Sequence, residues 1–339
     1  MSPYRKAISR ADVAELAGVS LAAVSQVLNN NQGHRISAET QNKIRLAAEQ
    51  LGYRPSSMAM AIKTGRTGNI GVLLCNTHDI FSPYTSGLLN GIWEALYQGK
   101  YRMLVDNLPE DGDASIMFRD KAIDGILLLA PSDGVQQVER MVEANFPVVS
   151  VGNRTNVPTH FFDMDNQQCA INITQRMIKY GHQRIAMLCG PVHSMSSARE
   201  RLEGFRLCMQ KNSLNIEEDW IIPSEYTRES GECATQVLLR AKQGYSAIFC
   251  ASDAIARGAM DILGQQGIKV PLQISLACVA STAPTDISSM VQDTKSIGRA
   301  AAEFLIQTIK RPASAVISQL LQGQWMPGET LQERPQTLK

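Results

Sequence analysis

The sequence predicts a small all-α head followed by a larger α/β body. Residues 9–51 contain three amphipathic helical patterns, separated by a glycine and by a polar loop, and no strand pattern. From Asn69 onward, short apolar runs alternate with helical stretches, which is typical of parallel sheets covered by helices on both faces. The 339 residues are enough for two or three domains of ordinary globular composition.

The head begins with two predicted short helices joined by a tight turn. Ser9 is placed to cap the first helix, and Asp12, three residues later, completes the capping pattern. Gly18 permits the sharp turn, and Ser20 is placed to cap the second helix. The side chains expected to face inward are Val13, Leu16, Ala17, Val19, Val24, Val27 and Leu28.

A third helix is predicted from Ser37 to Leu51, with Ile44 and Ala48 on its packing face and Gly52 as its stop. It is needed because two helices this short bury too little apolar surface to be stable alone. Three helices in this order form a helix-turn-helix unit, whose second helix lies in the major groove of DNA. Helix pairs joined by a glycine also occur in bundles that bind no nucleic acid, so the pattern alone leaves both alternatives open.

The charge is unevenly distributed along the chain. Residues 1–66 hold nine Lys/Arg and four Asp/Glu, a net charge of +5, whereas the remainder carries −4. A basic head on a mildly acidic body indicates that the head contacts a polyanion. No apolar run reaches membrane-spanning length and no basic, then apolar, leader follows Met1, so we expect a cytoplasmic protein.

The sequence contains no motif for catalysis or for a cofactor. No glycine-rich nucleotide motif follows a strand, no CxxC pair suggests a metal, and the five His residues are dispersed. We therefore expect no enzyme activity, no cofactor and no metal. Cys75, Cys189, Cys250 and Cys278 lie in apolar runs, which favours buried small hydrophobic side chains over the alternative of a redox sensor.

The body contains seven expected strands and at least five expected helices. The strands are 69–75, 101–107, 125–130, 147–152, 184–190, 245–251 and 274–280. The helices are 84–99, 166–180, 198–211, 231–243 and 253–266. In such sheets, ligands bind outside the carboxyl ends of the strands.

Several segments together resemble the lactose-repressor/galactose-repressor family. They are DVAELAGVS (12–20), AVSQVLN (23–29), SAET (37–40), LGYRP (51–55) and IGVLL (70–74). The resemblance runs through nearly the whole chain and implies two doubly wound subdomains, as in periplasmic binding proteins, with a cleft between them. The implied parts are a DNA-binding domain 1–55, a hinge 56–68, and a body 69–339 made of subdomain one (69–164 and 293–324) and subdomain two (165–292 and 325–339). The connection 108–123 is shorter than is usual in the family, so its helix is expected to be truncated.

The resemblance also implies which residues touch DNA. Leu21, Ala22 and Gln26 match base-reading positions. The first two can only contact thymine methyl groups or exclude bulky groups, while Gln26 can pair with adenine, so we expect an A·T pair at the position of Gln26. The side chains suited to phosphates are Ser20, Ser25, Asn29, Tyr53 and Ser56. His34 either reaches a phosphate or is a solvated loop residue.

Residues 56–63 match the family's hinge helix, which pairs with a second copy in the minor groove and inserts an apolar wedge. Here Ile62 holds the wedge position and Ala59 is small enough for close approach of the pair; a plain linker helix is the alternative. One head is too small for a specific site. We therefore expect a homodimer on a pseudo-palindromic double-stranded operator, with binding that weakens steeply as salt rises.

The segment SSARERLEGF (196–205) matches the family's effector motif. The resemblance implies that Arg201 is a forked donor to ligand hydroxyls, carboxylate or phosphate, with Ser197 beside it; a surface arginine paired with Glu200 or Glu203 is the alternative. Further positions that match the family's pocket are Tyr84, Phe162, Tyr226, Ser252, Asp253, Ala280 and Gln292. The aromatic ring at 162 can equally belong to the core.

Three positions depart from the family's pattern. Ala280 replaces an aspartate that grips sugar hydroxyls, Ser252 replaces an asparagine, and Gly152 stands where an acid can occur. Each lost charged hydrogen bond is worth about 1.5–3 kcal/mol, which weakens the case for a neutral sugar. With Arg201 retained, a sugar phosphate or sugar acid becomes plausible beside a sugar, and a vestigial pocket controlled by a protein partner is a further alternative.

The leading hypothesis is a dimeric transcriptional regulator, most simply a repressor, that a small effector controls allosterically. A solute receptor of the periplasmic type would share the two-lobed body. The basic head and the missing leader argue against it.

Overall fold

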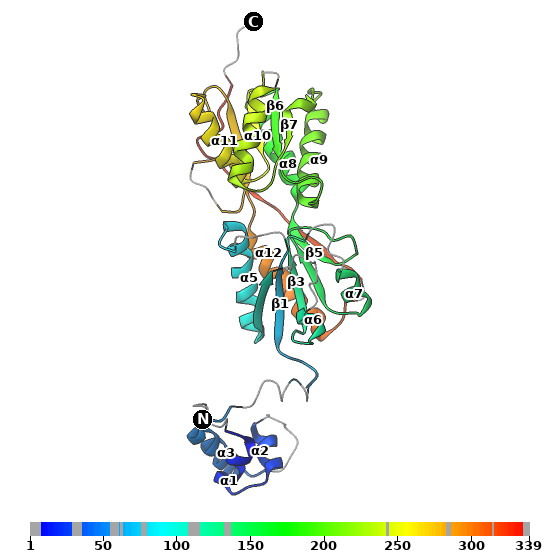
Figure 1. Cartoon of the computed structure of the whole chain (residues 1–339), viewed down its shortest axis with the longest axis vertical. Helices are drawn as coiled ribbons and strands as arrows, with labels where there is room; N and C mark the ends of the chain where they lie inside the picture. The colour runs from blue at the N-terminus through cyan, green and yellow to red at the C-terminus, as the bar shows by residue number, and fades with distance from the viewer. Residues whose placement is uncertain are drawn as a thin grey trace, which may run out of the picture. The chain divides into compact units, whose positions relative to one another are not determined.

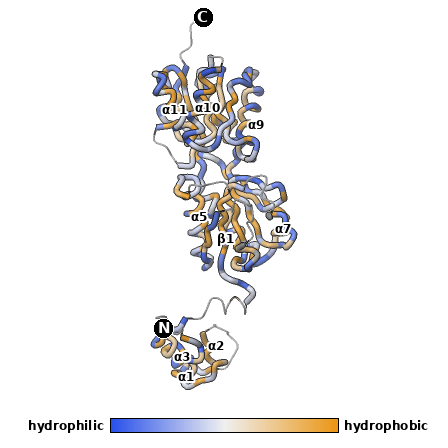
Figure 2. Tube along the Cα trace, viewed as in Figure 1, coloured by the Kyte–Doolittle hydropathy of each residue, from blue (hydrophilic) through white to orange (hydrophobic). Residues whose placement is uncertain are grey.

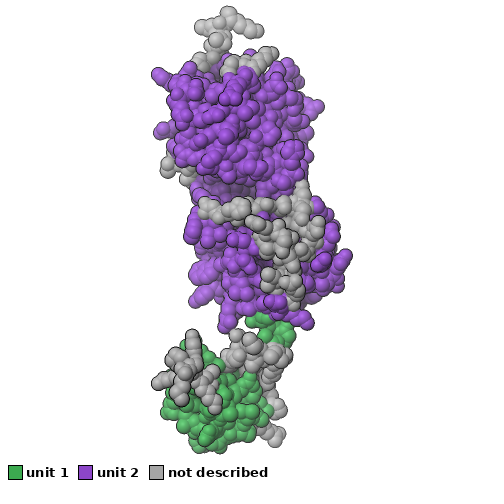
Figure 3. Space-filling model, viewed as in Figure 1, with its two compact units in different colours: residues 1–67 green, residues 68–339 purple. Residues whose placement is uncertain are grey.

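The computed structural model divides into two compact units, residues 1–67 and 68–339 (Figure 3). It describes residues 8–28, 36–54, 61, 64–75, 80–107, 116–131, 137–241, 244–282, 286–313 and 315–334. Five of the predicted DNA-binding residues lie outside this description: Asn29, His34, Ser56, Ala59 and Ile62.

Unit one contains the three predicted helices, α1 (Arg10–Ala17), α2 (Leu21–Leu28) and α3 (Ala38–Leu51). The Ser9 hydroxyl accepts from the Asp12 amide, and the Asp12 carboxylate accepts from the Ser9 amide, which confirms the predicted capping box. Gly18 and Gly52, the predicted helix stops, both adopt the left-handed conformation at φ 65° and 64°.

The core of the head is small and apolar. Its fully buried residues are Val13, Ala14, Val24, Ile44, Ala47 and Ala48, with Ala17, Val19, Val27, Leu28 and Leu51 packed against them. The predicted inward position of Leu16 is wrong, because its side chain is 51% exposed. In α1 the face toward the core carries Val13, Ala14 and Ala17, and successive helical positions rotate Leu16 away from it.

Unit two contains two six-stranded sheets, each forming one lobe (Figure 1). The first lobe holds, in sheet order, β11 (Ser318–Leu321), β5 (His160–Met164), β4 (Val148–Val151), β3 (Gly125–Leu129), β1 (Asn69–Leu74) and β2 (Arg102–Asn107). The second lobe holds β12 (Gln324–Met326), β10 (Ser289–Val291), β9 (Ser275–Ala280), β8 (Ala247–Cys250), β6 (Ile185–Cys189) and β7 (Ile221–Pro223). Neighbouring strands are parallel except β10 and β12, which confirms the predicted α/β class.

Helices cover these sheets, and the hydrophobic residues concentrate in the strands (Figure 2). The first lobe carries α5 (Pro83–Gly99), α6 (Ile116–Arg119), α7 (Gln137–Glu143) and α12 (Thr294–Lys310). The second lobe carries α8 (Asn166–Lys179), α9 (Ser196–Lys211), α10 (Arg228–Arg240), α11 (Asp253–Gln265) and the short 3-10 helix η1 (Glu218–Trp220). The four residues of α6 fit the truncated helix that was expected in this connection.

All seven expected strands and all five expected helices are present. Sequence reasoning did not name β5, β7, β10, α7 or α12, and it described residues 314–325 only as strand-like. Strands β7 and β10 have three residues each, too few to show an alternating pattern. The described chain passes between the lobes after β5, after β10 and after β11.

Among the described residues, no single helix is long and apolar enough to cross a membrane. Helices α1 and α2 reach the necessary length and apolar composition only when they are counted as one segment, and the chain bends by 107° between them.

Glycines let α5 and α12 approach closely in the first lobe. A Cβ at Gly91 would lie 1.9 Å from the Lys295 carbonyl oxygen, and one at Gly298 would lie 2.3 Å from that of Leu88. Both obstacles are backbone atoms, which a side-chain rotation does not relieve. This contact attaches α12, which follows the second lobe in sequence, to a helix that precedes it.

We predict that Gly91→Ala lowers the free energy of unfolding by about 2 kcal/mol or more, because the two helices must separate to admit the methyl group. Gly264→Ala in α11 is the matched control, since a Cβ there meets nothing within 4 Å. It should raise stability by about 0.5–1 kcal/mol through helix propensity. Denaturant titration of both variants measures the difference, and equal effects would contradict the close contact.

Candidate DNA-binding surface and interlobe cleft

Helix α2 presents the predicted base-reading side chains on an accessible face. Leu21 is 54% exposed, Ala22 is exposed, and Gln26 is half-buried, while Val24 faces the core. The predicted phosphate contacts are split: Ser20 is exposed and accepts from the Ala23 amide, whereas Ser25 and Tyr53 are half-buried. The face therefore offers small and apolar groups to a groove.

The Arg201 guanidinium is buried at the inner end of α9. Its Nε donates to Asn166 Oδ1 at 2.8 Å and its Nη1 to the Ala251 carbonyl at 2.5 Å. The guanidinium also lies 5.6 Å from the centroid of the Tyr226 ring. These contacts, rather than a pair with Glu200 or Glu203, orient Arg201, so the alternative of a surface arginine is wrong.

Asp163, at the end of β5, supplies a carboxylate that sequence reasoning missed. Its side chain is 2% exposed and accepts from Asn166 Nδ2 at 2.6 Å. Burial raises the pKa of Asp163 to about 6, while the nearby Arg201 charge acts in the opposite direction. Asp163 belongs to the first lobe and Arg201 to the second, so these two opposite charges come from different lobes.

Two polar atoms in the cleft lack partners within the described structure. They are the buried Tyr226 hydroxyl and Gln292 Oε1. The Tyr226 ring packs over Gly190, where a Cβ would lie 2.3 Å from a ring carbon. Gln292 is 5% exposed, and its Nε2 donates to Ser281 Oγ at 3.2 Å. A buried polar atom without a partner costs free energy, so both positions favour a ligand or water.

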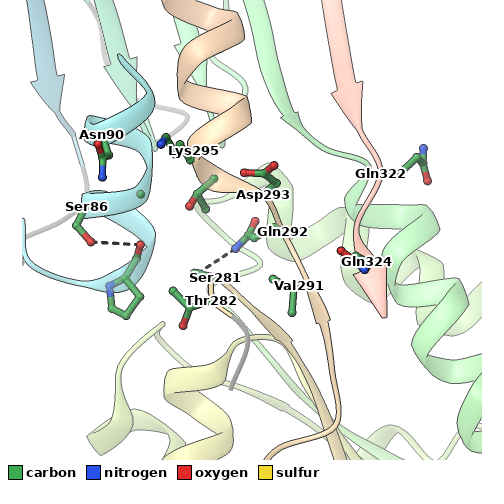
Figure 4. A pocket seen from close by; sticks show the side chains of 13 residues that line it. Ser86, Asn90, Ser281, Thr282, Val291, Gln292, Asp293, Lys295, Gln322 and Gln324 are labelled. Carbon is green, nitrogen blue, oxygen red and sulfur yellow. Dashed lines mark hydrogen bonds between the residues drawn. The ribbon is translucent and has the colours of Figure 1, made fainter. Parts of the chain in front are cut away.

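Gln292 also lines a cavity of about 570 Å³ between the lobes (Figure 4). The other lining residues are Pro83, Ser86, Gly87, Asn90, Ser281, Thr282, Val291, Asp293, Thr294, Lys295, Gln322 and Gln324. They come from α5 and α12, from the ends of β9 and β10, and from the segment that joins β11 to β12. The cavity has the size of a small-molecule site and lies at the carboxyl ends of strands, as parallel sheets predict.

The charged side chains that line the cavity already have partners. The Asp293 carboxylate accepts from the Ser296 amide at 2.9 Å and so caps α12. Lys295 Nζ lies 2.6 Å from Glu94 Oε1. The groups that remain for a ligand are mainly amides and hydroxyls.

Two predicted effector residues occupy other places than expected. Ala280 is fully buried in the apolar core, and its neighbour Ser281 lines the cavity instead. Phe162 is 1% exposed and packs on Phe304 with 5.4 Å between ring centroids, which favours the core interpretation.

Gln292 is the one predicted effector residue that lines this cavity; Tyr84, Ser197, Arg201, Tyr226, Ser252 and Asp253 are not among its lining residues. Ser252 caps α11, since its Oγ accepts from the Ile255 amide. The neighbouring Asp253 accepts from the Ser281 amide at 3.3 Å. The Tyr84 hydroxyl fills the space where a side chain at Gly152 would stand, which explains why that position holds no acid.

Helix α9, which carries Arg201, receives its N-terminal cap from the opposite lobe. Its own N-cap residue makes no side-chain cap. Instead Asn153, fully buried just after β4, accepts through Oδ1 from the Ser196 hydroxyl at 2.9 Å and from the Ser197 amide at 3.0 Å. Its Nδ2 donates to the Pro131 carbonyl at 2.7 Å, which holds the side chain in the first lobe.

Arg154 reinforces the same junction between the lobes. Its amide donates to Ser196 Oγ at 3.0 Å and its Nε lies 3.3 Å from Glu200 Oε1. Ser197, predicted beside the effector, thus takes part in lobe closure through its backbone. No sequence pattern marked Asn153, Asp163 or Asn166, because their partners are more than thirty residues away or in the other lobe.

No described group of His, Cys, Asp or Glu could hold a metal. Burial raises the pKa of the Cys189 thiol to about 11 and also raises that of Cys250, which fits buried small hydrophobic side chains rather than redox sensors. Cys278 is buried as well, while Cys75 is half-buried. His182 is structural: its ring nitrogens meet Ser246 Oγ and the Gln332 carbonyl.

Comparison with known proteins identifies both parts of the chain. Residues 11–56 match the model of "Bacterial regulatory proteins, lacI family", and residues 174–331 match a "Periplasmic binding protein-like domain". The HTH-type transcriptional repressor PurR of Vibrio parahaemolyticus is 30% identical over 317 residues, which cover 88% of this chain and 91% of that protein. The chain belongs to the lacI family of bacterial regulatory proteins.

Other known proteins match over similar lengths. Catabolite control protein A of Priestia megaterium is 26% identical and covers 88% of this chain and 92% of its own. The CelR–cellobiose complex is 26% identical with a TM-score of 0.73, covering 95% of this chain and 99% of that one. The lac repressor dimer bound to operator, 23% identical over 96% and 99% of the chains, shares the fold with a TM-score of 0.83. The chain is thus a DNA-binding transcriptional regulator of a non-enzymatic family, with an effector domain.

We predict that Asn153→Ala exposes the first amides of α9 and loosens the junction between the lobes. Loss of a side-chain cap costs about 1 kcal/mol, so exchange of the Ser197 amide should accelerate about five- to tenfold. Thr227→Ala is the control, because Thr227 caps α10 by accepting from the Ser230 amide within one lobe. Hydrogen exchange and a spin-label distance between the lobes should change together only for Asn153→Ala; unchanged lobe spacing in that variant would contradict the coupling.

We predict that Asp163 lowers the free energy of unfolding as pH rises from about 4, near the pKa of the unfolded state, to about 6, the pKa in the folded state. A carboxyl whose pKa is raised by folding stabilises the folded state below its unfolded value near 4, and this contribution is lost as pH rises to about 6. Between pH 4.5 and 7 the unfolding free energy should fall by about 2 kcal/mol more than in Asp163→Asn, from the size of the shift. Urea titrations at both pH values measure this, and parallel pH profiles would refute it.

Proposed function

We propose that this regulator is a repressor that binds a pseudo-palindromic operator as a homodimer and is controlled by a neutral, hydroxyl-rich small molecule in the cleft between the lobes. The observation that carries the effector proposal is that the charged groups around the cleft already have partners within the chain: Arg201 lies near Asp163, Lys295 pairs with Glu94, and Asp293 caps α12. Asp163 lies close enough to lower the electrostatic cost of burying Arg201, and the unpartnered groups are a tyrosine hydroxyl and an amide oxygen. Such groups recognise hydroxyls rather than a net charge.

The sequence made an anionic ligand plausible beside a neutral sugar, because the aspartate of the family pattern is absent at Ala280. Asp163 changes this expectation, since it restores a carboxylate beside Arg201 from another strand. The related CelR was solved with cellobiose, a neutral disaccharide, which supports a ligand of this kind. The 570 Å³ cavity and the two unpartnered atoms also favour an effector over a vestigial pocket.

The first lobe offers a surface for the homodimer. On α5, Trp93 and Tyr97 are 52% and 72% exposed and stack with 5.5 Å between ring centroids. Beside them β2 forms an edge of its sheet, with Val105 44% exposed. Exposed aromatic side chains of this kind are typical of protein interfaces. The lac repressor, whose fold this chain shares, was solved as a dimer on its operator.

The α2 surface suits a half-site that is read mainly by shape and apolar contact. Leu21 and Ala22 can meet thymine methyl groups, and Gln26 can pair with adenine. Few base contacts per head make the second copy necessary for specificity.

The test combines DNA selection with an effector screen. Selection of random duplexes on the full chain should recover an inverted repeat with A·T pairs where Gln26 reads. On that duplex, neutral mono- and disaccharides, sugar phosphates and sugar acids are then compared by fluorescence anisotropy and thermal shift. We expect a neutral sugar to change DNA affinity and to raise the unfolding temperature.

Tyr226→Phe is the matched variant, because it removes only the unpartnered hydroxyl. It should weaken the responding sugar about fivefold, the value of one neutral hydrogen bond, and leave DNA affinity without ligand unchanged. A response to sugar phosphates or acids alone would refute the neutral effector. Recovery of no repeated motif would refute the operator hypothesis.

A further inference from the structure

Arg10, the first residue of α1, lies beside two side chains that the sequence assigns to phosphate contacts. Its Nε donates to the Tyr53 hydroxyl at 3.2 Å and its Nη1 donates to Ser25 Oγ at 3.3 Å. Ser25 belongs to α2 and Tyr53 follows α3. One guanidinium therefore joins three segments of the head on the side where α2 carries its predicted DNA contacts.

The positive charge of Arg10 has no counterpart within the described head. Both of its partners are neutral hydroxyls, and no described carboxylate forms an ion pair with it. A cation in the first turn of a helix is also unfavourable, since the N-terminal end of the helix dipole is itself positive. The folded head thus holds a charge that its own interactions do not require, which points to an anion outside the chain.

We propose that Arg10, Ser25 and Tyr53 form a phosphate clamp, a site for one backbone phosphate of DNA at the side of α2. A guanidinium offers forked donors that match phosphate oxygens. The Tyr53 oxygen accepts from Arg10, so its own hydrogen is directed elsewhere and can be donated to the same phosphate. Sequence reasoning assigned Ser25 and Tyr53 to phosphates separately, and it gave Arg10 no role.

The phosphate clamp would set how α2 sits in the groove. A phosphate contact carries no base information, but it fixes the position of the helix that does. Because the contact joins α1, α2 and the end of α3, it holds the exposed Leu21 and Ala22 at one depth. This inference rests on operator binding as proposed above.

The first test measures how DNA affinity depends on salt, using the full chain and the selected duplex. Arg10→Gln removes one phosphate contact, so the slope of log affinity against log salt should become shallower by about 1. Binding to selected and random duplexes should weaken by the same factor. Lys43→Gln is the control of equal charge: Lys43 is exposed on α3 and pairs with Glu39, and its loss should leave the slope unchanged.

The second test places the contact on the DNA. Single methylphosphonates, which are neutral, replace each phosphate of one half-site in turn. The unchanged protein should lose affinity at one position beside α2, and Arg10→Gln should lose none there, because the two changes remove the same interaction. Arg10→Lys keeps the charge without the fork and covers the case in which Arg10→Gln is unstable: it should keep the salt slope but bind more weakly.

The phosphate clamp would be overturned by an unchanged slope in Arg10→Gln, by an equal change in Lys43→Gln, or by additive losses at every methylphosphonate. A loss of preference at one base pair with no change in slope would assign Arg10 to a base instead and would also overturn it. If the unchanged protein binds no duplex, operator binding itself fails, which is a distinguishable result.

Discussion

Several buried polar groups of the cleft belong to one lobe and have their interaction partners in the other lobe. Arg201 lies in the second lobe, and Asp163, the buried carboxyl group whose raised pKa the Arg201 charge partly lowers, lies in the first. The first amides of α9 are unsatisfied within their own lobe, and Asn153 of the first lobe accepts from Ser197. An uncompensated buried charge or amide is costly, so neither lobe presents its cleft surface independently of the other. The arrangement of the lobes is therefore part of the site.

This dependence gives a physical route from a ligand to the proposed dimer surface. A molecule that satisfies Tyr226 and Gln292 would stabilise one spacing of the lobes over another, and only such a difference in affinity shifts an equilibrium between conformations. Glycines bring the backbones of α5 and α12 into close contact within the first lobe. The exposed pair Trp93 and Tyr97 lies on α5, so a change in this lobe would reach the proposed dimer surface directly.

Much of the fold could be predicted from the sequence because its signals are local. The capping box at Ser9, the glycine stops and the long apolar strands follow from residues only a few positions apart. Leu16 was misplaced because a helix of eight residues has too few apolar positions to define its buried face. The three-residue strands were missed for a similar reason.

The candidate site was predictable only where a family motif covered it. Arg201 was singled out through the segment 196–205, and the structure buries its side chain. Asp163 interacts with Arg201, 38 residues away, and Asn153 with Ser196 and Ser197, 43 and 44 residues away. Arg10 donates to Ser25 and Tyr53, 15 and 43 residues away. No pattern in a single sequence encodes such distant partners. The sequence also could not show that Ser281 rather than Ala280 lines the cavity. The two residues are neighbours at the end of a strand, and the direction of each side chain decides which of them faces the cavity.

The place of α12 in the chain also has a consequence for biosynthesis. The first lobe gains this helix and the edge strand β11 only from residues 294–321, after the whole sheet of the second lobe except β12 has emerged from the ribosome. Until then α5 lacks the neighbour that its glycines fit, and β5 is an open edge. The nascent chain must therefore hold an incomplete lobe while a later one folds, a period in which its uncovered apolar surface is a target for chaperones and for aggregation.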